Sequence, residues 1–449
     1  MLSPASITRH QEKPPDCCPG ETAGGVSLTT RNSIRVLHLH GRMGRGGAEV
    51  RTLDLFQGLD RREWQFDFCA LSGLPGELDA AIEALGGRVY LMREGRPGFP
   101  RRFRELLERG AYDVVHSHLG LWSGYVLRLA AECGVPGRVA HFRSTGYERC
   151  GSGARRLVRR LLSPWVPRFG GQLVMRRLTN RYATHLLGCS EAALDLAWGP
   201  DWRSDPRCHV VYDGFSLGEE MGTGISPDGI SRRLSPIGSE PVPISSRAHR
   251  AAVRQEFGLS QDAPLCIHVG RITEPKNHLR LAAIFRQLLR RRPDARLLLV
   301  GRTDDAAIAR RLAHRIAKLD LADRVVLAGD RRDVHRLMAA ADALVFPSLW
   351  EGLGGVVVEA AGLGLPVVAS DLPAIREIAA QLPGVHLLPL AADDDRWAAR
   401  IDVLLAGGIS AAGRAAARQA FRQSPFALDQ CARAMRRLWQ EAAARETLG

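Results

Sequence analysis

The sequence predicts an α/β protein made of two doubly wound, Rossmann-like domains in series. From Ile34 onward, short apolar runs alternate with stretches of helical periodicity. One interruption, at 216–246, consists about half of Gly, Pro and Ser, and the alternation then starts again. Strands that alternate with helices form βαβ units, whose strands are parallel. We therefore expect one parallel sheet before the interruption and another after it.

Strands are predicted where short runs of aliphatic and β-branched residues lie between polar or glycine-rich turns. In the first half these runs are Ile34–His40, Gln65–Ala70, Arg88–Met92, Asp113–His116, Arg138–Phe142, His185–Cys189 and His209–Tyr212. In the second half they are Leu265–Val269, Ala295–Val300, Val325–Ala328, Ala343–Phe346 and Val367–Ala369.

Helices are predicted where apolar residues recur at helical spacing. The predicted helices are Ala48–Gly58, Glu77–Leu85, Leu121–Cys133, 278–291, 305–318, 333–341 and 353–362. The tail, about 393–446, is rich in Ala and Arg and is predicted to be helical throughout. We expect one break in it, at Ser424-Pro425, because the residue before a proline disfavours helical backbone angles.

The chain is expected to have five segments. They are a disordered head (1–33), a first Rossmann-like domain (34–215), a loop or linker insert (216–246), a second Rossmann-like domain (247–422) and a final helix with a tail (423–449). Disorder is expected in the head because it lacks periodicity and apolar runs.

Length and composition exclude several classes of protein. A chain of 449 residues with 45% hydrophobic and 24% charged residues is typical of globular proteins. It has no uncharged apolar run of 18 residues and no apolar core in the first 33, so we expect neither a membrane-spanning helix nor a secretion signal. The nine cysteines are scattered without a CxxC pair, which indicates reduced cytosolic thiols and no zinc site.

The positive charge is concentrated in one stretch. The net charge is +14, and Arg155–Arg181 contains eight arginines and no acidic residue. Arg155, Arg156, Arg159 and Arg160 alternate with apolar residues and Trp165 follows, which suits an anionic membrane surface; a solvated basic helix is the alternative. Aromatic residues make up 6% of the chain and rarely interleave with this stretch, so no nucleic-acid partner is expected.

The first candidate site is the glycine-rich loop from Gly41 to Glu49, between a predicted strand and a predicted helix. Glycines there, Gly46 and Gly47 in particular, let backbone N–H groups approach an anion at the helix N-terminus. The glycine order is not GxGxxG, so a nicotinamide site loses its main support. An ordinary tight turn is the alternative.

Two histidines form the second candidate. His116 and His118 lie at the carboxyl end of a predicted strand, where open α/β sheets bind ligands, and period-2 spacing puts them on one side. They could serve a hydroxyl-bearing substrate. Metal binding is not expected, because no carboxylate or cysteine lies at ligand spacing. Partly buried structural histidines are the alternative.

The third candidate is the loop Gly270-Arg271 to Lys276-Asn277, which follows a strand and opens a helix. Arginine offers a fork of donors to phosphate oxygens, and lysine offers a point charge. A lysine is notable in a chain that has only three of them. A solvated basic turn is the alternative.

The fourth candidate is a pair of carboxylates, Glu351 and Glu359, with a glycine-rich turn between them. If Glu351 lies on the loop before the helix, it can face a bound sugar while Glu359 reaches a ribose. The free N–H groups of 353–355 would then face a pyrophosphate. Two surface glutamates around a tight turn are the alternative.

Together, these motifs resemble retaining glycosyltransferases of the GT-B fold, family 4 type, over about residues 34–445. The stretch from Tyr182 to Glu191 is also similar to exopolysaccharide and capsule glycosyltransferases. The resemblance implies two domains facing a cleft, with the nucleotide-sugar donor mainly on the second. It implies a last helix, about Phe426–Ala443, that crosses back to the first domain. It also implies retention of anomeric configuration with no cofactor and no obligatory metal.

The resemblance assigns roles to individual residues. Those expected to be catalytic are His118, Arg271, Lys276 and Glu351. Those expected to bind the donor are Gly46, Gly47, Gly270, Asn277, Gly352, Leu353, Gly354, Gly355 and Glu359. Those expected on the acceptor and membrane side are His116, His141, Arg143, Arg155, Arg156, Arg159, Arg160 and Trp165.

The expected function is sugar transfer from a nucleotide-diphosphate sugar to a glycan or polyprenyl-linked acceptor, in cell-surface polysaccharide synthesis. The expected location is cytoplasmic, peripheral on the inner face of the cell membrane. One alternative is a nucleotide-sugar epimerase, which would need no separate acceptor. The other is a non-catalytic basic protein that binds nucleic acid or lipid.

Overall fold

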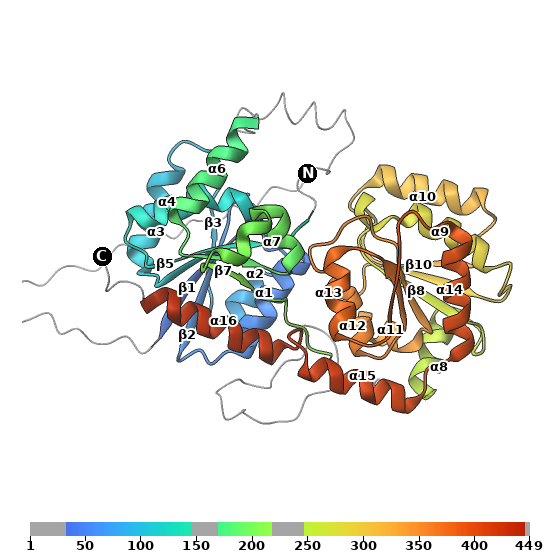
Figure 1. The fold of residues 1–449 in the computed structure, drawn as a ribbon. Coiled ribbons are helices and arrows are strands. Elements are labelled where there is room, and N and C mark those ends of the chain that lie inside the picture. Colours follow the sequence, from blue (N-terminus) through green and yellow to red (C-terminus); the bar gives the residue numbers. More distant parts are fainter. Residues whose placement is uncertain (1–32, 146–168, 218–246, 445–449) are drawn as a thin grey trace, which may run out of the picture. The chain divides into compact units, whose positions relative to one another are not determined.

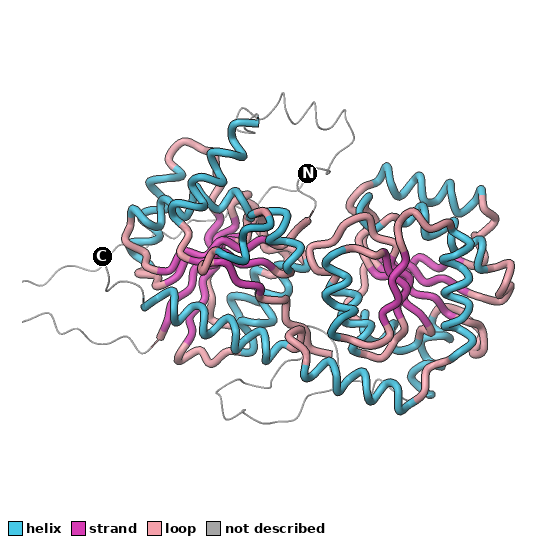
Figure 2. The backbone as a smooth tube through the Cα atoms, viewed as in Figure 1, coloured by secondary structure: helices cyan, strands magenta, loops and turns pink. Residues whose placement is uncertain are grey.

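The computed structural model describes residues 33–145, 169–217 and 247–444. The expected head, most of the insert, and Arg155, Arg156, Arg159, Arg160 and Trp165 lie outside these residues. Two parallel sheets, each with helices on both faces, form the framework (Figures 1 and 2). The prediction of two doubly wound α/β domains is therefore confirmed.

The first sheet has seven strands in the order β3-β2-β1-β4-β5-β6-β7. Their bounds are β1 Ile34–His40, β2 Trp64–Ala70, β3 Val89–Leu91, β4 Val114–Ser117, β5 Gly137–Phe142, β6 His185–Gly188 and β7 Cys208–Val210. Its helices are α1 Gly47–Gly58, α2 Asp79–Ala84, α3 Phe99–Gly110, α4 Ser123–Glu132, α6 Phe169–Tyr182 and α7 Glu191–Trp198. The strand order reverses between β1 and β4, and such a switch point is where open α/β sheets bind ligands.

The second sheet has six strands in the order β10-β9-β8-β11-β12-β13, with its switch point between β8 and β11. The strands are β8 Leu265–Val269, β9 Arg296–Val300, β10 Val325–Gly329, β11 Ala343–Phe346, β12 Val367–Ser370 and β13 Val385–Leu388. The helices within 247–444 are α8 Arg247–Glu256, α9 His278–Leu288, α10 Ala306–Lys318, α11 Val334–Ala340, α12 Gly355–Gly362, α13 Pro373–Gln381, α14 Asp394–Gly407, α15 Ala411–Gln423 and α16 Leu428–Ala443, of which α16 belongs with the first sheet.

The twelve predicted strands are all present, and two expectations need correction. Strand β13 was not predicted, because it is a short, only partly buried edge strand between Gly384 and Pro389. The tail is not helical throughout but forms α14, α15 and α16. The additional break lies at Gly408, whose φ of 63° is a left-handed conformation that ends a helix. The predicted break at Ser424-Pro425 is confirmed.

Helix α16, the last described element of the chain, packs against the first sheet (Figure 1). Before it begins, the N–H of Phe215 donates to the carbonyl of Phe426 (2.9 Å) and that of Leu428 donates to the carbonyl of Phe215 (3.0 Å). Trp439 is fully buried, with its ring centre 5.5 Å from that of Trp64 and 5.1 Å from that of Phe66 on β2. The predicted crossing of the last helix is therefore confirmed, and the first core is completed by residues from the end of the chain.

Of the helices in the described ranges, none is both long enough and apolar enough to traverse a lipid bilayer.

Candidate functional site

The candidate residues gather at the carboxyl ends of the strands beside the two switch points. His40 ends β1 and His118 follows β4 in the first sheet, while Arg271 follows β8 and Glu351 follows β11 in the second. Contacts join these two edges. The Thr145 hydroxyl donates to the backbone carbonyl of Glu351 (2.6 Å). Both halves of the chain thus contribute to one site.

In the glycine-rich loop, Gly46 is the residue before the first turn of α1. A Cβ atom there would lie 2.2 Å from the Glu49 carboxylate, so a larger residue at 46 would make the Glu49 side chain move from its place over the start of the helix. A Cβ on Gly47 would meet no atom within 4 Å. The backbone at Gly47 therefore faces open space, as close approach of a ligand requires.

Glu49 is a carboxylate in a strongly positive setting. Burial outweighs its backbone hydrogen bond and the charges of Arg143, Arg271 and Arg302, so the pKa of Glu49 lies above its usual value. Arg271 and Arg302 belong to the second half of the chain, so the start of α1 lies within electrostatic reach of the loops after β8 and β9.

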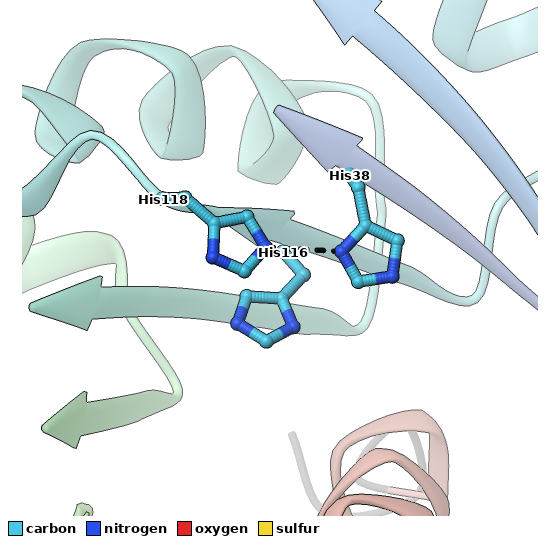
Figure 3. A group of neighbouring side chains, drawn as sticks. All are labelled: His38, His116 and His118. Atoms are coloured by element: carbon cyan, nitrogen blue, oxygen red, sulfur yellow. Dashed lines mark hydrogen bonds between the residues drawn. The ribbon is translucent and has the colours of Figure 1, made fainter. Parts of the chain in front are cut away.

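Five histidines line the switch point of the first sheet. They are His38 and His40 on β1, His116 on β4, His118 after it, and His141 on β5. The ring of His118 stacks on His40 (4.1 Å between centres) and on His116 (4.3 Å). Figure 3 shows His118 hydrogen-bonded to His38, with 3.1 Å between His118 Nε2 and His38 Nδ1. The expectation that His116 and His118 lie on one side is confirmed.

All five imidazoles are uncharged at neutral pH. Burial, followed by the positive charge of Arg143, lowers the pKa of His38 to about 3. Burial and neighbouring basic groups hold the pKa values of the other four well below the usual value. The cluster thus offers neutral hydrogen-bonding groups rather than cations.

Among the described residues, His38, His116 and His118 have ring nitrogens within 4.8 Å of one another, as a metal site would. The hydrogen bond at His116 does not fit that use. Its Nδ1 accepts the indole N–H of Trp439 (3.2 Å), whereas a metal-bound histidine normally donates its second nitrogen's proton outward. The nearby Arg143 guanidinium would also repel a cation. The donor set therefore suits hydrogen bonding to oxygen rather than metal binding.

Arg143, which follows β5, ties the histidine cluster to α1. Its guanidinium donates to the carbonyl of Ala48 (2.9 Å) and forms an ion pair with Asp213. A Cβ atom on Gly352 would lie only 2.2 Å from the backbone carbonyl oxygen of Arg143. Only glycine at 352 allows the second domain's turn to approach this closely.

The basic loop of the second domain places Lys276 beside Glu351, with 2.7 Å between Nζ and Oε1. The aliphatic part of Lys276 crosses Gly270, and its ammonium lies 4.9 Å from the centre of the Phe346 ring. Arg271 is half-exposed and pairs with Asp304 (3.1 Å). Two cations on one loop thus have exposed surface at the switch point.

Asn277 has a left-handed conformation (φ 54°) that turns the chain from this loop into α9. Its side-chain amide donates to the carbonyl of Pro347 (3.0 Å), which fixes the basic loop to the loop after β11. Its observed role is to position the basic loop.

Glu351 lies on the loop before α12, which is the position that it needs in order to face a bound sugar. Gly354 has a φ of 91°, which favours glycine, and Gly355 begins the helix. Leu353 is buried. The first N–H groups of α12 have no carbonyl partner within the helix, so this end can accept an anion.

Glu359, in the second turn of α12, accepts a hydrogen bond from His335 (3.3 Å) and lies 3.8 Å from the Arg51 guanidinium. Burial favours its neutral form, but the hydrogen bond and charge of His335 and the charge of Arg51 outweigh burial, so the pKa lies below its usual value. Glu359 is therefore an ionised acceptor for hydroxyl groups.

Sequence reasoning missed His38, His40, Arg51 and His335. The two histidines on β1 repeat the period-2 spacing of His116 and His118, and parallel pairing of β1 with β4 brings them together. That spacing could have found them. Arg51 and His335 carry no such signal, because their partner Glu359 is far away in the sequence.

Comparison with known proteins matches both halves of the chain. Residues 46–214 match the model of the glycosyl transferase 4-like domain, and residues 263–407 match that of glycosyl transferases group 1. The chain is 30% identical over 379 residues to EpsF of Bacillus subtilis, which is named as a glycosyltransferase; the match covers 83% of this chain and 88% of EpsF.

Two further proteins are similar over most of their length. An Escherichia coli protein named UDP-Gal:alpha-D-GlcNAc-diphosphoundecaprenol alpha-1,3-galactosyltransferase is 23% identical, covering 77% of this chain and 81% of its own. The crystal structure of Anabaena HepE has a TM-score of 0.69 at 19% identity and covers 91% of this chain and all of HepE, which supports the fold. The chain therefore belongs to the glycosyltransferases, with a glycosyl transferase 4-like domain followed by a group 1 domain.

Proposed function

We propose that the protein transfers a sugar, with retention of anomeric configuration, from a nucleotide-diphosphate sugar to a glycan or polyprenyl-linked acceptor. The observation that carries the proposal is the grouping at the second switch point. There Lys276 lies 2.7 Å from Glu351, Arg271 is on the same loop as Lys276, and Glu351 is on the turn that leads into the N-terminus of α12. Cations and N–H groups gathered in this way suit a diphosphate, and the carboxylates suit hydroxyl groups.

The reaction builds negative charge on the departing diphosphate. Arg271, Lys276 and the N–H groups at the start of α12 would stabilise this charge from fixed positions, which lowers the barrier. Gly46 and Gly47 would cover the phosphates from the first domain, where Gly47 has open space for them.

The remaining parts of the donor are assigned to carboxylates and to His118. Glu359, ionised and partly exposed, would hold the ribose hydroxyls, and Glu351 would hold hydroxyls of the transferred sugar. Gly270 and Asn277 would keep the basic loop in place. His118, neutral and stacked between His40 and His116, would contact the sugar near its anomeric carbon.

The acceptor and its location are proposed from the relatives and from the basic stretch. The Escherichia coli relative is named for a diphosphoundecaprenol-linked acceptor, another relative is named for capsular polysaccharide biosynthesis, and HepE was crystallised with UDP-glucose. We place this chain in cell-surface polysaccharide synthesis at the inner face of the cell membrane. His116, His141 and Arg143 belong to the acceptor-side domain.

Donor binding is tested by isothermal titration with a panel of nucleoside diphosphates. Lys276→Ala and Glu359→Gln should each weaken the nucleotide that binds best by about 10- to 100-fold, because each removes a hydrogen bond with a charged group. Lys318→Ala, at an exposed position on α10, and Glu105→Gln, at a partly exposed position on α3, are matched controls and should leave affinity unchanged. Equal affinity in all four variants would refute the donor site.

Stereochemistry and metal dependence are tested in one assay. Proton NMR of the product should show the same anomeric configuration as the donor, at the same rate with and without EDTA, since Arg271 and Lys276 supply the positive charge. An inverted product would refute retention. Loss of activity in EDTA that Mg²⁺ restores would refute metal independence.

Membrane association is tested by flotation with liposomes. Protein should float with vesicles of anionic lipid and not with neutral ones, and replacing Arg155, Arg156, Arg159 and Arg160 by Gln should reduce the floating fraction. Flotation that does not depend on anionic lipid would contradict this placement.

A further inference from the structure

Trp439 links the last helix to the histidine cluster through a hydrogen bond whose direction is fixed. Its indole N–H donates to His116 Nδ1 at 3.2 Å, and both side chains are fully buried. An indole nitrogen can donate but cannot accept. His116 Nδ1 must therefore be the acceptor and cannot carry a proton.

The direction of the Trp439–His116 bond determines the direction of the hydrogen bond between His116 and His141. His116 is neutral, because burial and the basic groups around it keep its pKa well below the usual value. Its single ring proton is then on Nε2, which lies 3.2 Å from His141 Nδ1. His141 Nδ1 accepts, and since His141 is also neutral, its own proton is on Nε2.

The chain of hydrogen bonds ends at an unused donor. His141 Nε2 is buried and has no hydrogen-bond partner among the residues that the structure describes. His141 lines a small cavity together with His38, His118, Arg143 and Asp213. The cavity has room for about one water-sized group. A buried N–H that lacks a partner costs free energy, so an oxygen ligand at this point would be favoured.

We propose that Trp439 is a positioning residue that, through His116, holds His141 as an Nε2–H donor to a hydroxyl oxygen of the sugar substrates. The catalytic part of this inference rests on the proposed sugar transfer, whereas the proton positions do not. The hydroxyl belongs either to the donor sugar or to the acceptor, and the kinetic test below separates these sources.

The same bond opposes protonation of the cluster. A protonated His116 would direct an Nδ1–H at the indole N–H of Trp439, and two donors would then face each other. The groups that act electrostatically on His116 are basic as well: His38, His141, Arg143 and His40. Removing the indole N–H relieves one of the constraints that keep His116 neutral and in a single tautomer.

The test compares Trp439→Phe with Trp64→Phe. Trp64 is also buried and touches Trp439, but within the described ranges its indole nitrogen has no hydrogen-bond partner. Both variants lose similar buried surface, and only Trp439→Phe loses a bond to a histidine. Long-range proton–nitrogen NMR spectra of histidine-labelled protein without substrate report which ring nitrogen carries the proton. Signals are assigned by their loss in His116→Asn and His141→Asn.

The wild type should show the Nε2–H tautomer for both His116 and His141, Trp64→Phe should keep it, and Trp439→Phe should give mixed tautomers. An Nδ1–H tautomer at His116 in the wild type would overturn the proposal, and so would an unchanged pattern in Trp439→Phe. This measurement needs neither substrate nor activity. The wild-type spectrum alone shows which ring nitrogens of His116 and His141 carry the proton, even if a variant does not fold.

Steady-state kinetics then test the catalytic part. Trp439→Phe should lower kcat/KM for transfer about two- to tenfold more than Trp64→Phe does, as loss of one hydrogen bond allows. A raised KM for the nucleotide sugar would assign the hydroxyl to the donor, and a raised KM for the acceptor would assign it to the acceptor. Equal effects of the two variants would refute the role in transfer. If no sugar transfer is detectable in the wild type, the proposed function fails while the tautomer result stands.

Discussion

The site depends on close contact between the turn at 351–355 and the carboxyl edge of the first sheet. The hydroxyls of Thr145 and Ser190 donate to the backbone carbonyls of Glu351 and Gly352, and Gly352 lies directly against the carbonyl of Arg143. A side chain at 352 would separate the two edges. In the proposed reaction, this contact would allow a carboxylate and a lysine from the second sheet to act on the same ligand as histidines from the first.

The charged groups of the site are paired with one another. Lys276 pairs with Glu351, Arg271 with Asp304, and Arg51 approaches Glu359. The Arg271–Asp304 pair is the most exposed of the three, so it contributes little to stability and can be exchanged for a ligand at small cost. The side chains of the other two pairs are mostly buried, so a ligand that displaces one partner has to supply the interaction that the other partner loses. A diphosphate would compete for the cations and sugar hydroxyls would compete for the carboxylates. The histidine cluster differs from this pattern, because it is neutral and buried and its hydrogen bonds fix its geometry.

Much of this arrangement was predictable from local sequence, because it depends on strand ends. The apolar runs predict twelve of the strands in the two sheets. The loops after β1, β4, β8 and β11 contain residues that the structure brings together. Tertiary contacts were not predictable in this way. Trp439 and His116 are 323 positions apart, and nothing in either segment shows that they meet. The edge strand β13 was missed because it is short and only partly buried, so its sequence carries little of the apolar pattern that marks a strand.

The central claim is that both sheets act on one donor: the second binds the nucleotide and hydroxyls of the sugar, and His118 of the first contacts the sugar near its anomeric carbon. It is tested most directly in His118→Ala, by measuring both the Kd for the nucleoside diphosphate and the single-turnover rate of sugar transfer. His314→Ala on α10 is an exposed control. The account predicts a Kd unchanged within about twofold and a rate lower by about 10²- to 10³-fold, the usual cost of losing one fixed contact to the reacting group. A weakened Kd with an unchanged rate, or no effect on either, would contradict it.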